Sequence, residues 1–335
     1  MRVTVLAGGI GAARFLEGLR LAAPAAQLTV IGNTADDITL HGLRVCPDLD
    51  TVMYTLGGGI HPGQGWGRAE ETFTVAGELA QYGAEPTWFT LGDRDIATHV
   101  LRTRLLGHGV PLSEVTEILC RRWQPGVQLL PMSDDRVETH VLVPGDDPQA
   151  PPTAVHFQEW WVRRHGEPDA ERFEFVGVES ARPGPGVIEA LTDADIVIIG
   201  PSNPVVSVGP ILAVPGVRSA LRDRAGAVVG VSPIVSGRAV RGMAESCLRT
   251  LGVEISAAGV LGMYADLIDA WLVAPQDAAT CSAAAPPGVR VIGTPLLMTD
   301  AVAAAAMATQ ALAAAGLTAA GFTTTATAAA GDQPR

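Results

Sequence analysis

The opening of the chain constrains the fold more than any other part. It contains a buried strand from Val3 to Ala7, a glycine turn, a helix from about Gly11 to Ala23 that Pro24 ends, and a second strand from Leu28 to Ile31. Two successive strands connected through a helix run parallel, because a hairpin can connect only antiparallel strands. The opening therefore predicts an α/β, Rossmann-like fold with a mostly parallel central sheet flanked by helices.

Later segments continue this pattern. Short apolar runs predict further buried strands at Thr87 to Leu91, Val127 to Leu130, Val137 to Val143, Phe173 to Val178, Ile196 to Ile199 and Ala227 to Val231. Helices are predicted at Ile96 to Leu106, Ser113 to Arg122, Val187 to Leu191, Gly216 to Arg224 and Met243 to Leu251. We expect one α/β domain over residues 1–315 with helical and loop insertions. A disordered tail is expected at 316–335, where Ala, Thr and Gly leave few groups to pack.

The charged residues exclude several chemistries. The formal net charge is −12, and all 23 basic side chains are Arg. Without Lys there is no Schiff base, no pyridoxal-phosphate anchor and no P-loop lysine. The acidic balance argues against nucleic acid and anionic membranes, so small-molecule partners are expected.

Two further features bear on the location of the protein. The four cysteines lie far apart and are expected to be reduced. Glycines interrupt the apolar N-terminus, and no apolar run is long enough for a membrane span. We therefore expect a cytoplasmic protein with no membrane partner.

A glycine turn is the first candidate for a ligand site. Gly8, Gly9 and Gly11 follow a strand and open a helix, where free N–H groups favour a phosphate. A turn needed only for strand–helix packing explains the same glycines. The third glycine of a dinucleotide-binding signature is replaced by Arg14, and Asn33 stands where an acid would bind the ribose, so NAD binding is disfavoured.

An acidic cluster is the second candidate. Asp36 and Asp37 are followed by Asp48 and Asp50. Carboxylates two residues apart in an extended segment lie on the same side of the chain, so both can face one hard cation such as Mg²⁺. Solvated loop acids and helix caps are the alternative.

The third candidate is the turn from Thr90 to Asp95, which would follow a predicted strand. Arg94 would hold a phosphate there, and Asp93 would orient it or cap the next helix. Two later turns, Pro131 to Asp135 and Gly200 to Pro204, carry short polar side chains between prolines. Carboxyl ends of parallel strands share one edge of a sheet, so these turns are expected to converge.

A segment rich in glycine, from Gly57 to Gly67, has two interpretations. It is either a mobile cover over a flat ligand, with Trp66 stacking on that ligand, or a surface loop.

The order of the motifs supports a family resemblance. They are Gly8 to Gly11, Asn33 to Asp37, Pro47 to Thr51, Leu91 to Asp95, Pro131 to Asp135, Phe157-Gln158 and Gly200 to Pro204. This succession resembles the 2-phospho-L-lactate transferase family of deazaflavin-coenzyme biosynthesis, including its actinobacterial phosphoenolpyruvate transferase members. It spans roughly residues 1 to 300. Arg14 and Gly242-Met243 depart from the Lys and the Gly-Pro pair that are frequent in the family.

The resemblance implies a reaction of coenzyme F-420 biosynthesis. A phosphate-linked three-carbon acid, phosphoenolpyruvate or 2-phospho-L-lactate, would pass from a guanosine-diphosphate-activated donor to the ribityl hydroxyl of the deazaflavin Fo, and GMP would be released. Such a transfer needs positioning and charge neutralisation, which Mg²⁺ and arginine supply without Lys.

The resemblance also implies roles for particular residues. Nucleotide contacts are expected from Gly8, Gly9, Gly11, Asn33, Ser202 and Asn203, and Mg²⁺ ligands from Asp36, Asp48 and Asp50. Fo would meet Asp50, Thr90 and Trp66, while Asp50 and Arg94 would be the catalytic residues. Replacing Asp50 by Asn is expected to abolish turnover and leave the fold intact. A homodimer is also expected.

Two other functions fit parts of the sequence. A non-catalytic nucleotide-sugar-binding regulator would share the glycine-rich start, but it resembles the segments after the second strand less well. An NAD-dependent oxidoreductase conflicts with Arg14 and Asn33.

Overall fold

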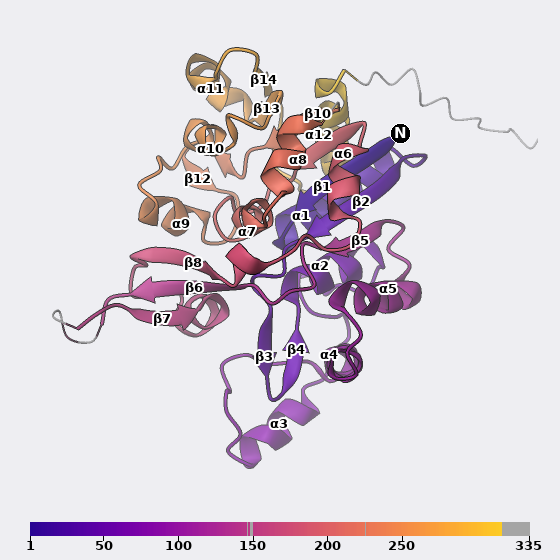
Figure 1. Cartoon of the computed structure of the whole chain (residues 1–335), viewed down its shortest axis with the longest axis vertical. Helices are drawn as coiled ribbons and strands as arrows, with labels where there is room; N and C mark the ends of the chain where they lie inside the picture. The colour runs from indigo at the N-terminus through magenta and orange to yellow at the C-terminus, as the bar shows by residue number, and fades with distance from the viewer. Residues whose placement is uncertain (146, 148–149, 225, 317–335) are drawn as a thin grey trace, which may run out of the picture.

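The fold is built on a parallel sheet of seven strands (Figure 1), seen in a computed structural model that describes residues 1–145, 147, 150–224 and 226–316. The strand order is β14-β13-β10-β9-β1-β2-β5, and every pairing is parallel. The strands are β1 (Arg2–Ala7), β2 (Gln27–Gly32), β5 (Gln128–Pro131), β9 (Ile196–Ile199), β10 (Ala227–Val231), β13 (Ala270–Val273) and β14 (Arg290–Gly293). The predicted Rossmann-like α/β fold is confirmed.

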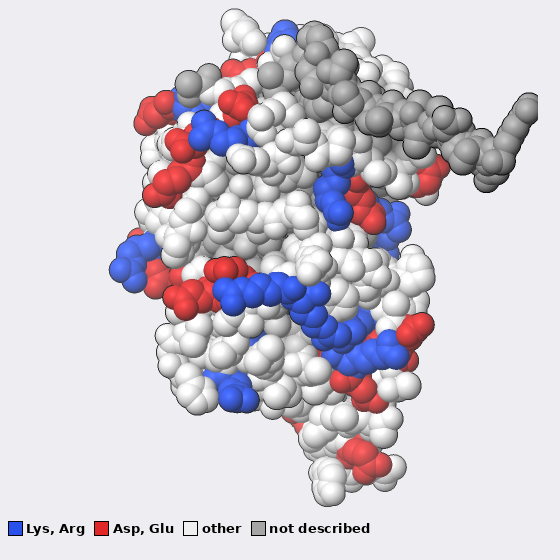
Figure 2. Space-filling model, turned by 90° about the vertical axis from the view of Figure 1, so that its right-hand side faces the viewer, with Lys and Arg blue, Asp and Glu red and all other residues white. Residues whose placement is uncertain are grey.

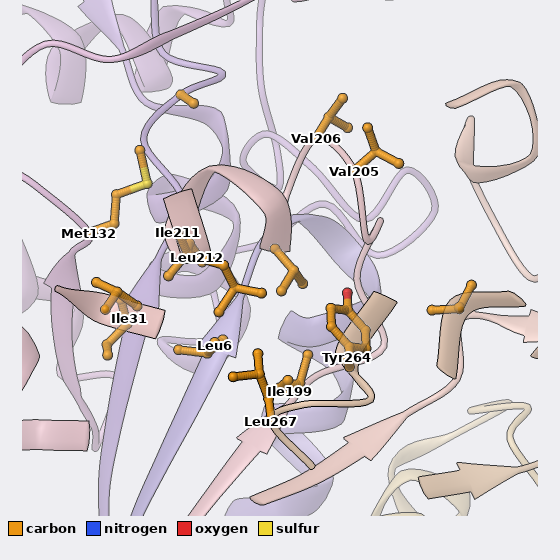
Figure 3. Packing of buried hydrophobic residues seen from close by; sticks show 14 of the residues in the cluster. Leu6, Ile31, Met132, Ile199, Val205, Val206, Ile211, Leu212, Tyr264 and Leu267 are labelled. Carbon is orange, nitrogen blue, oxygen red and sulfur yellow. The ribbon is translucent and has the colours of Figure 1, made fainter. Parts of the chain in front are cut away.

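Successive residues of the central strands enter two different cores. In β9, Ile196 and Ile198 face one cluster, whereas Val197 and Ile199 face the other. Figure 3 shows the second cluster, where Leu6 and Ile199 of the sheet lie near Ile211 of a covering helix. Both faces of the sheet are therefore buried, which explains why these strands are apolar throughout.

Helices cover both faces. The first core contains side chains of α1 (Gly9–Ala22), α2 (Pro47–Leu56), α5 (Leu112–Trp123) and α12 (Ala301–Ala314). The second core contains those of α6 (Val187–Thr192), α7 (Val208–Ala213), α8 (Val217–Asp223), α9 (Ala244–Thr250), α10 (Ala257–Tyr264) and α11 (Ala278–Ala284). α1 and α12 touch through their backbones, since a Cβ on Gly18 would lie 2.2 Å from the carbonyl carbon of Ala304.

The expected insertions lie beside the sheet (Figure 1). One contains the hairpin β3 (Ile38–Leu40) and β4 (Leu43–Val45), followed by α3 (Thr74–Gln81) and α4 (Asp93–Gly107). The other is an antiparallel sheet of β7 (Thr153–His156), β6 (Glu138–Val143) and β8 (Arg172–Val176), with a π-helix at Glu159–Arg163. Short elements complete the described fold: β11 (Ile234–Val235), β12 (Arg238–Ala239) and the 3₁₀ turns Val178–Ser180 and Pro275–Asp277.

Several sequence-based assignments need correction. The predicted strand from Thr87 to Leu91 is wrong: the segment is irregular, and its apolar side chains pack on the β3–β4 hairpin instead of on the central sheet. The predicted strands at 137–143 and 173–178 exist, but as β6 and β8 of the antiparallel sheet. Strands β13 and β14 were not predicted. The predicted tail, apart from Gly316, lies outside the described residues.

Charges of both signs are interspersed on the face drawn in Figure 2. Arg side chains there form a continuous band across the middle of the face, and Asp and Glu side chains lie beside this band. Of the helices that the structure describes, none combines the length and apolar character needed to cross a membrane. All four cysteines are free thiols.

Candidate active site

A cavity of about 1110 Å³ lies at the point where the strand order of the sheet reverses. β1 sits between β2 and β9, so the strands that follow β1 extend the sheet on opposite sides. The segments after β1 and β9 both line the cavity, through Gly8 to Gly11 and Pro201 to Asn203. Open parallel sheets bind ligands at this position, outside the carboxyl ends of the strands.

The glycine turn packs closely against the segment that follows β9. A Cβ on Gly8 would lie 2.6 Å from Cβ of Ser207, and one on Gly11 would lie 2.4 Å from the carbonyl oxygen of Pro201. Gly9 has φ of +70°, which favours glycine. The packing interpretation of these glycines is therefore correct. It does not compete with ligand binding, because the same residues line the cavity at the N-terminus of α1, where no side chain caps the helix.

Ser202 connects the two strand-end turns. Its Oγ donates a hydrogen bond to the carbonyl oxygen of Gly8 at 2.8 Å and accepts one from the Gly8 N–H at 3.2 Å. Asn203 accepts a hydrogen bond from the Val205 N–H at 2.9 Å. Ser202 and Asn203 both line the cavity. The structure thus brings together the predicted residues of the first and last turns.

Asp36 and Asp48 are two buried carboxylates at the floor of this cavity. Burial, together with the nearby charges of Asp48 and Asp37, raises the pKa of Asp36 well above its usual range. Burial also raises the pKa of Asp48 to about 6, although the hydrogen bond from Asn33 opposes the shift. Asp36 Oδ1 is buried without a hydrogen-bond partner. Two neighbouring carboxylates with an unsatisfied oxygen fit a bound cation.

The donor set suits magnesium more than a metal held by protein ligands alone. Within the described ranges, no group of three or more His, Cys, Asp or Glu side chains is arranged to hold a metal ion. Mg²⁺ is commonly bound by one or two carboxylates, with waters and substrate phosphates completing six positions. Asp36 and Asp48 fit that requirement.

Asp50 is separated from this pair, contrary to the premise of the sequence argument. Pro47–Leu56 is a helix, not an extended segment, so Asp48 and Asp50 point in different directions from its first turn. Both oxygens of Asp50 accept hydrogen bonds from the guanidinium of Arg102, one from Nη1 at 3.0 Å and the other from Nη2. His99 Nδ1 lies 3.8 Å away. Asp50 still lines the cavity, but as part of a buried ion pair.

A second buried polar group continues from this ion pair. The hydroxyl of Tyr54 donates to Asp95 Oδ1 at 2.6 Å, and His99 Nε2 lies 3.4 Å from Asp95 Oδ2. Burial alone would raise the pKa of Asp95, but His99 and Tyr54 outweigh it, and the pKa is lowered. Tyr54, Asp95 and His99 line the cavity, so this wall is polar, and His99 Nε2 is buried there without a hydrogen-bond partner.

Two predicted site residues lie outside the cavity. Asn33 is fully buried behind the wall: its amide donates to Asp48 at 2.9 Å and its oxygen accepts from the Ala35 N–H. It therefore positions Asp48 and has no free group for a nucleotide. The guanidinium of Arg94 pairs with Glu70 at 2.9 Å and does not line the cavity. Its predicted place depended on the strand that is absent.

Two predicted ligand turns instead stabilise helices and loops. Asp93 accepts hydrogen bonds from Thr72 Oγ1 at 2.6 Å and from the N–H groups of Thr74 and Val75 at the start of α3. The hydrogen bond from Thr72 contributes most to lowering the pKa of Asp93 to about 2. The turn from Thr90 to Asp95 still lines the cavity through Thr90, Leu91, Gly92 and Asp95. The turn from Pro131 to Asp135 does not, and its Asp134 accepts a hydrogen bond from the Ser113 N–H at the start of α5. The expected convergence of all turns is therefore wrong for this one.

The segment from Gly57 to Gly67 lines the cavity through His61, Gln64, Trp66 and Gly67. The Ala69 N–H donates to the Gly59 carbonyl at 2.9 Å, which closes the segment into a loop. Arg241 Nη2 donates to the carbonyl oxygen of Gln64 at 2.7 Å from the opposite side. Trp66 is 54% exposed and lines the cavity, as does Thr90.

Sequence reasoning missed several lining residues. They include Arg68, Trp88, Phe89, Trp161 and Arg241. Arg68 directly follows the glycine-rich segment, and a basic residue next to that segment was the available signal. Trp88 and Phe89 lie in the run that is predicted as a strand, and no motif marks Trp161 or Arg241 as a lining residue.

Comparison with known proteins adds the family. The family model described as 2-phospho-L-lactate transferase CofD matches residues 3–287. The chain is 58% identical over 306 residues to a phosphoenolpyruvate transferase of Streptomyces griseus, covering 91% of this chain and 95% of that one. It is 50% identical over 319 residues to a phosphoenolpyruvate transferase of Mycolicibacterium smegmatis, covering 91% and 96%.

Solved structures support the fold. A crystal structure of a UPF0052-family protein from Bacillus halodurans aligns with 93% of this chain and 100% of that chain, with a TM-score of 0.59 at 17% identity. At this identity the likeness concerns the fold alone.

The fold and the cavity define a Rossmann-like α/β protein whose candidate site lies at the switch point of a parallel sheet. The matched region covers most of the sequence, and the chain belongs to the 2-phospho-L-lactate transferase CofD family. It is therefore a member of a family of transferases.

Proposed function

We propose that this chain transfers a phosphate-linked three-carbon acid from a guanosine-diphosphate-activated donor to the ribityl hydroxyl of Fo, with release of GMP, in coenzyme F-420 biosynthesis. One observation carries the proposal beyond family membership. The buried pair Asp36 and Asp48 faces the same cavity as the uncapped N-terminus of α1. A carboxylate pair beside a phosphate-binding helix end suits a substrate that carries phosphates and a cation together.

Magnesium is the proposed cofactor, held by Asp36 and Asp48. When bound, it would neutralise charge on the phosphates as the phosphorus–oxygen bond to GMP breaks. Asn33 keeps Asp48 in place through its amide, and the turns joined by Ser202 shape the nucleotide end of the cavity.

The acceptor end is proposed to lie against the other wall. The ribityl oxygen forms the new bond to phosphorus, and its proton must leave to a base. Asp50 remains the proposed acceptor of that proton, with Arg102 fixing its orientation. A carboxylate has about four lone-pair positions, so the two bonds from Arg102 do not use all of them. Trp66 and Thr90 are proposed to contact Fo, since both line this cavity.

The donor is proposed to be the enolpyruvyl compound. The relatives from Streptomyces griseus, Thermobifida fusca and Mycolicibacterium smegmatis are all named phosphoenolpyruvate transferases, at 58%, 58% and 50% identity. The lactyl compound differs only in the three-carbon acid, so both donors belong in the test.

The test is a product assay with purified protein, Fo and each guanylated donor, with and without Mg²⁺. We expect a phosphorylated deazaflavin and an equal amount of GMP, only with Mg²⁺, and faster with the enolpyruvyl donor. Tight nucleotide binding without product would favour the non-catalytic regulator. Product formation at an equal rate after metal removal would refute the role of magnesium.

A further inference from the structure

Arg68 is a buried cation at the wall of the cavity. It follows the glycine-rich loop, where a bridge pairs its backbone with Ile60, and only 9% of the residue is exposed. Its guanidinium carbon lies 4.9 Å from the ring centroid of Trp123 and 6.0 Å from that of Tyr54. Because cations favour aromatic faces, these rings hold the guanidinium in one orientation.

The charge of Arg68 has no counterion within the described part of the chain. The comparably buried Arg102 pairs with Asp50, and no carboxylate lies within 4.0 Å of Arg68. Its guanidinium makes one hydrogen bond, from Nη1 to the carbonyl oxygen of Arg94 at 2.8 Å, and its Nε is buried without a partner. An unpaired buried cation is costly, so such a group at a cavity wall indicates an anionic ligand.

The neighbouring acids are all occupied by other partners. Glu70 pairs with Arg94, and Glu71 accepts hydrogen bonds from the backbone N–H groups of Arg94 and Asp95. Asp95 accepts from Tyr54 at 2.6 Å. The carboxylates of Glu70, Glu71 and Asp95 therefore interact with groups other than Arg68.

The glycine-rich loop fixes the position of this cation. A Cβ on Gly59 would lie 2.1 Å from the ring of Trp123, so the loop backbone lies directly against that ring. Trp123 is therefore covered by the loop and by the guanidinium of Arg68 together. This contact gives the loop a second role besides lining the cavity.

We propose that Arg68 binds an anionic group of the donor, either a phosphate or the carboxylate of its three-carbon acid. The identity of the ligand rests on the proposed function, whereas the need for an anion follows from the buried charge. A planar guanidinium donates to two oxygens of either group. Asp36 and Asp48 make one part of the cavity acidic, so an anionic donor needs a cation there, and Arg68 supplies one that no carboxylate of the described residues neutralises.

The test compares Arg68→Gln with Arg122→Gln as the matched control. Arg122 is exposed, does not line the cavity, and stacks on the same Trp123 ring at 5.0 Å. Calorimetric titration with GDP and with the guanylated enolpyruvyl donor, both with Mg²⁺, gives the affinities. Losing a hydrogen bond to a charged group weakens binding by about 10- to 100-fold. We expect this loss for the donor with Arg68→Gln and no change with Arg122→Gln.

Comparison of GDP with the enolpyruvyl donor shows which anionic group Arg68 binds. An equal loss for GDP and the donor assigns a phosphate to Arg68, whereas a loss for the donor alone assigns the carboxylate. Arg68→Lys retains a cation and is expected to bind with intermediate affinity; it replaces Arg68→Gln if that variant does not fold. Unchanged donor affinity in the folded variants would overturn the proposal.

The binding titration gives its result whether or not the protein catalyses the proposed transfer. A wild-type chain that binds these ligands through Arg68 but forms no product would refute only the proposed transfer. Product formation with affinities that do not depend on Arg68 would refute only this inference.

Discussion

Replacing Arg102 by Met is expected to destabilise the protein severely, because it leaves Asp50 charged and buried. The two side chains are 2% and 7% exposed and share two hydrogen bonds. After the change, the basic side chain that remains beside Asp50 is the imidazole of His99, with Nδ1 3.8 Å away. Removing one partner of a buried ion pair costs about 3–5 kcal/mol, or about 100- to 5000-fold in the unfolding equilibrium.

A surface pair provides the control. Arg121 and Glu117 lie 2.8 Å apart on α5, but their side chains are 70% and 68% exposed. Arg121→Met should cost no more than about 0.5 kcal/mol, because water screens such pairs. The measurement is urea unfolding followed by tryptophan fluorescence, with free energies from linear extrapolation. Equal losses for the two variants would show that the Asp50–Arg102 pair is not a buried structural element.

The same pair changes the interpretation of Asp50 variants. Asp50→Asn leaves the cation of Arg102 buried without its counterion, so the expectation that this change leaves the fold intact needs correction. The double variant Asp50→Asn with Arg102→Met removes both charges and should recover much of the stability lost by Arg102→Met alone. Activity lost in this double variant, at restored stability, would then report the role of Asp50 in the reaction.

Three smaller predictions test other parts of the structure. Gly8→Ala should lower the free energy of unfolding by about 1–3 kcal/mol, because its Cβ would lie 2.7 Å from Asp48 Oδ2. Gly77→Ala in α3 has open space around it and should raise the free energy of unfolding by about 0.5–1 kcal/mol. Equal urea midpoints for the two variants would contradict this. The four thiols should react slowly with a thiol reagent at pH 8, because burial raises the pKa of Cys120 and Cys247 to about 12, that of Cys281 to about 11, and that of Cys46 well above its usual range. Unfolding in urea should make all four reactive. Asp93 has a lowered pKa of about 2, so its support of the α3 N-terminus is complete above the unfolded-state pKa and is lost as the pH falls towards 2. Protection of the α3 amides, relative to their intrinsic exchange rates, that stays unchanged between pH 4 and 2 would contradict this.

Local patterns in the sequence predicted the fold class and five of the seven central strands, but not β13 and β14. The opening strand, glycine turn and helix define a parallel pair, and the apolar run Ile196 to Ile199 matches β9. The run from Thr87 to Leu91 is also rich in large apolar side chains, but it packs on a hairpin, because apolar character indicates burial and not the packing partner.

The site was predictable where turns follow strands and unpredictable where side chains meet across elements. Gly8 and Ser202 adjoin because β1 and β9 are neighbours, which strand order implies. The partners of Asp50 and Asp48 could not be predicted: α2 separates the two carboxylates, and Arg102 comes from a helix 52 residues further along the chain. Such pairings depend on tertiary packing, which no local pattern encodes.

The central claim is that Asp36 and Asp48 hold the magnesium that brings the donor phosphates into the cavity. It is tested most directly by titrating Mg²⁺, in the presence of GDP, into the wild-type chain and into the Asp36→Asn and Asp48→Asn variants. Both variants should bind Mg²⁺ more than about 100-fold more weakly, since even residues beyond the first ligands carry 10- to 100-fold. Without metal, each variant should unfold at a higher urea concentration than the wild type, because one of two adjacent buried carboxylates is neutralised. Wild-type affinity for Mg²⁺ in both variants would contradict the claim.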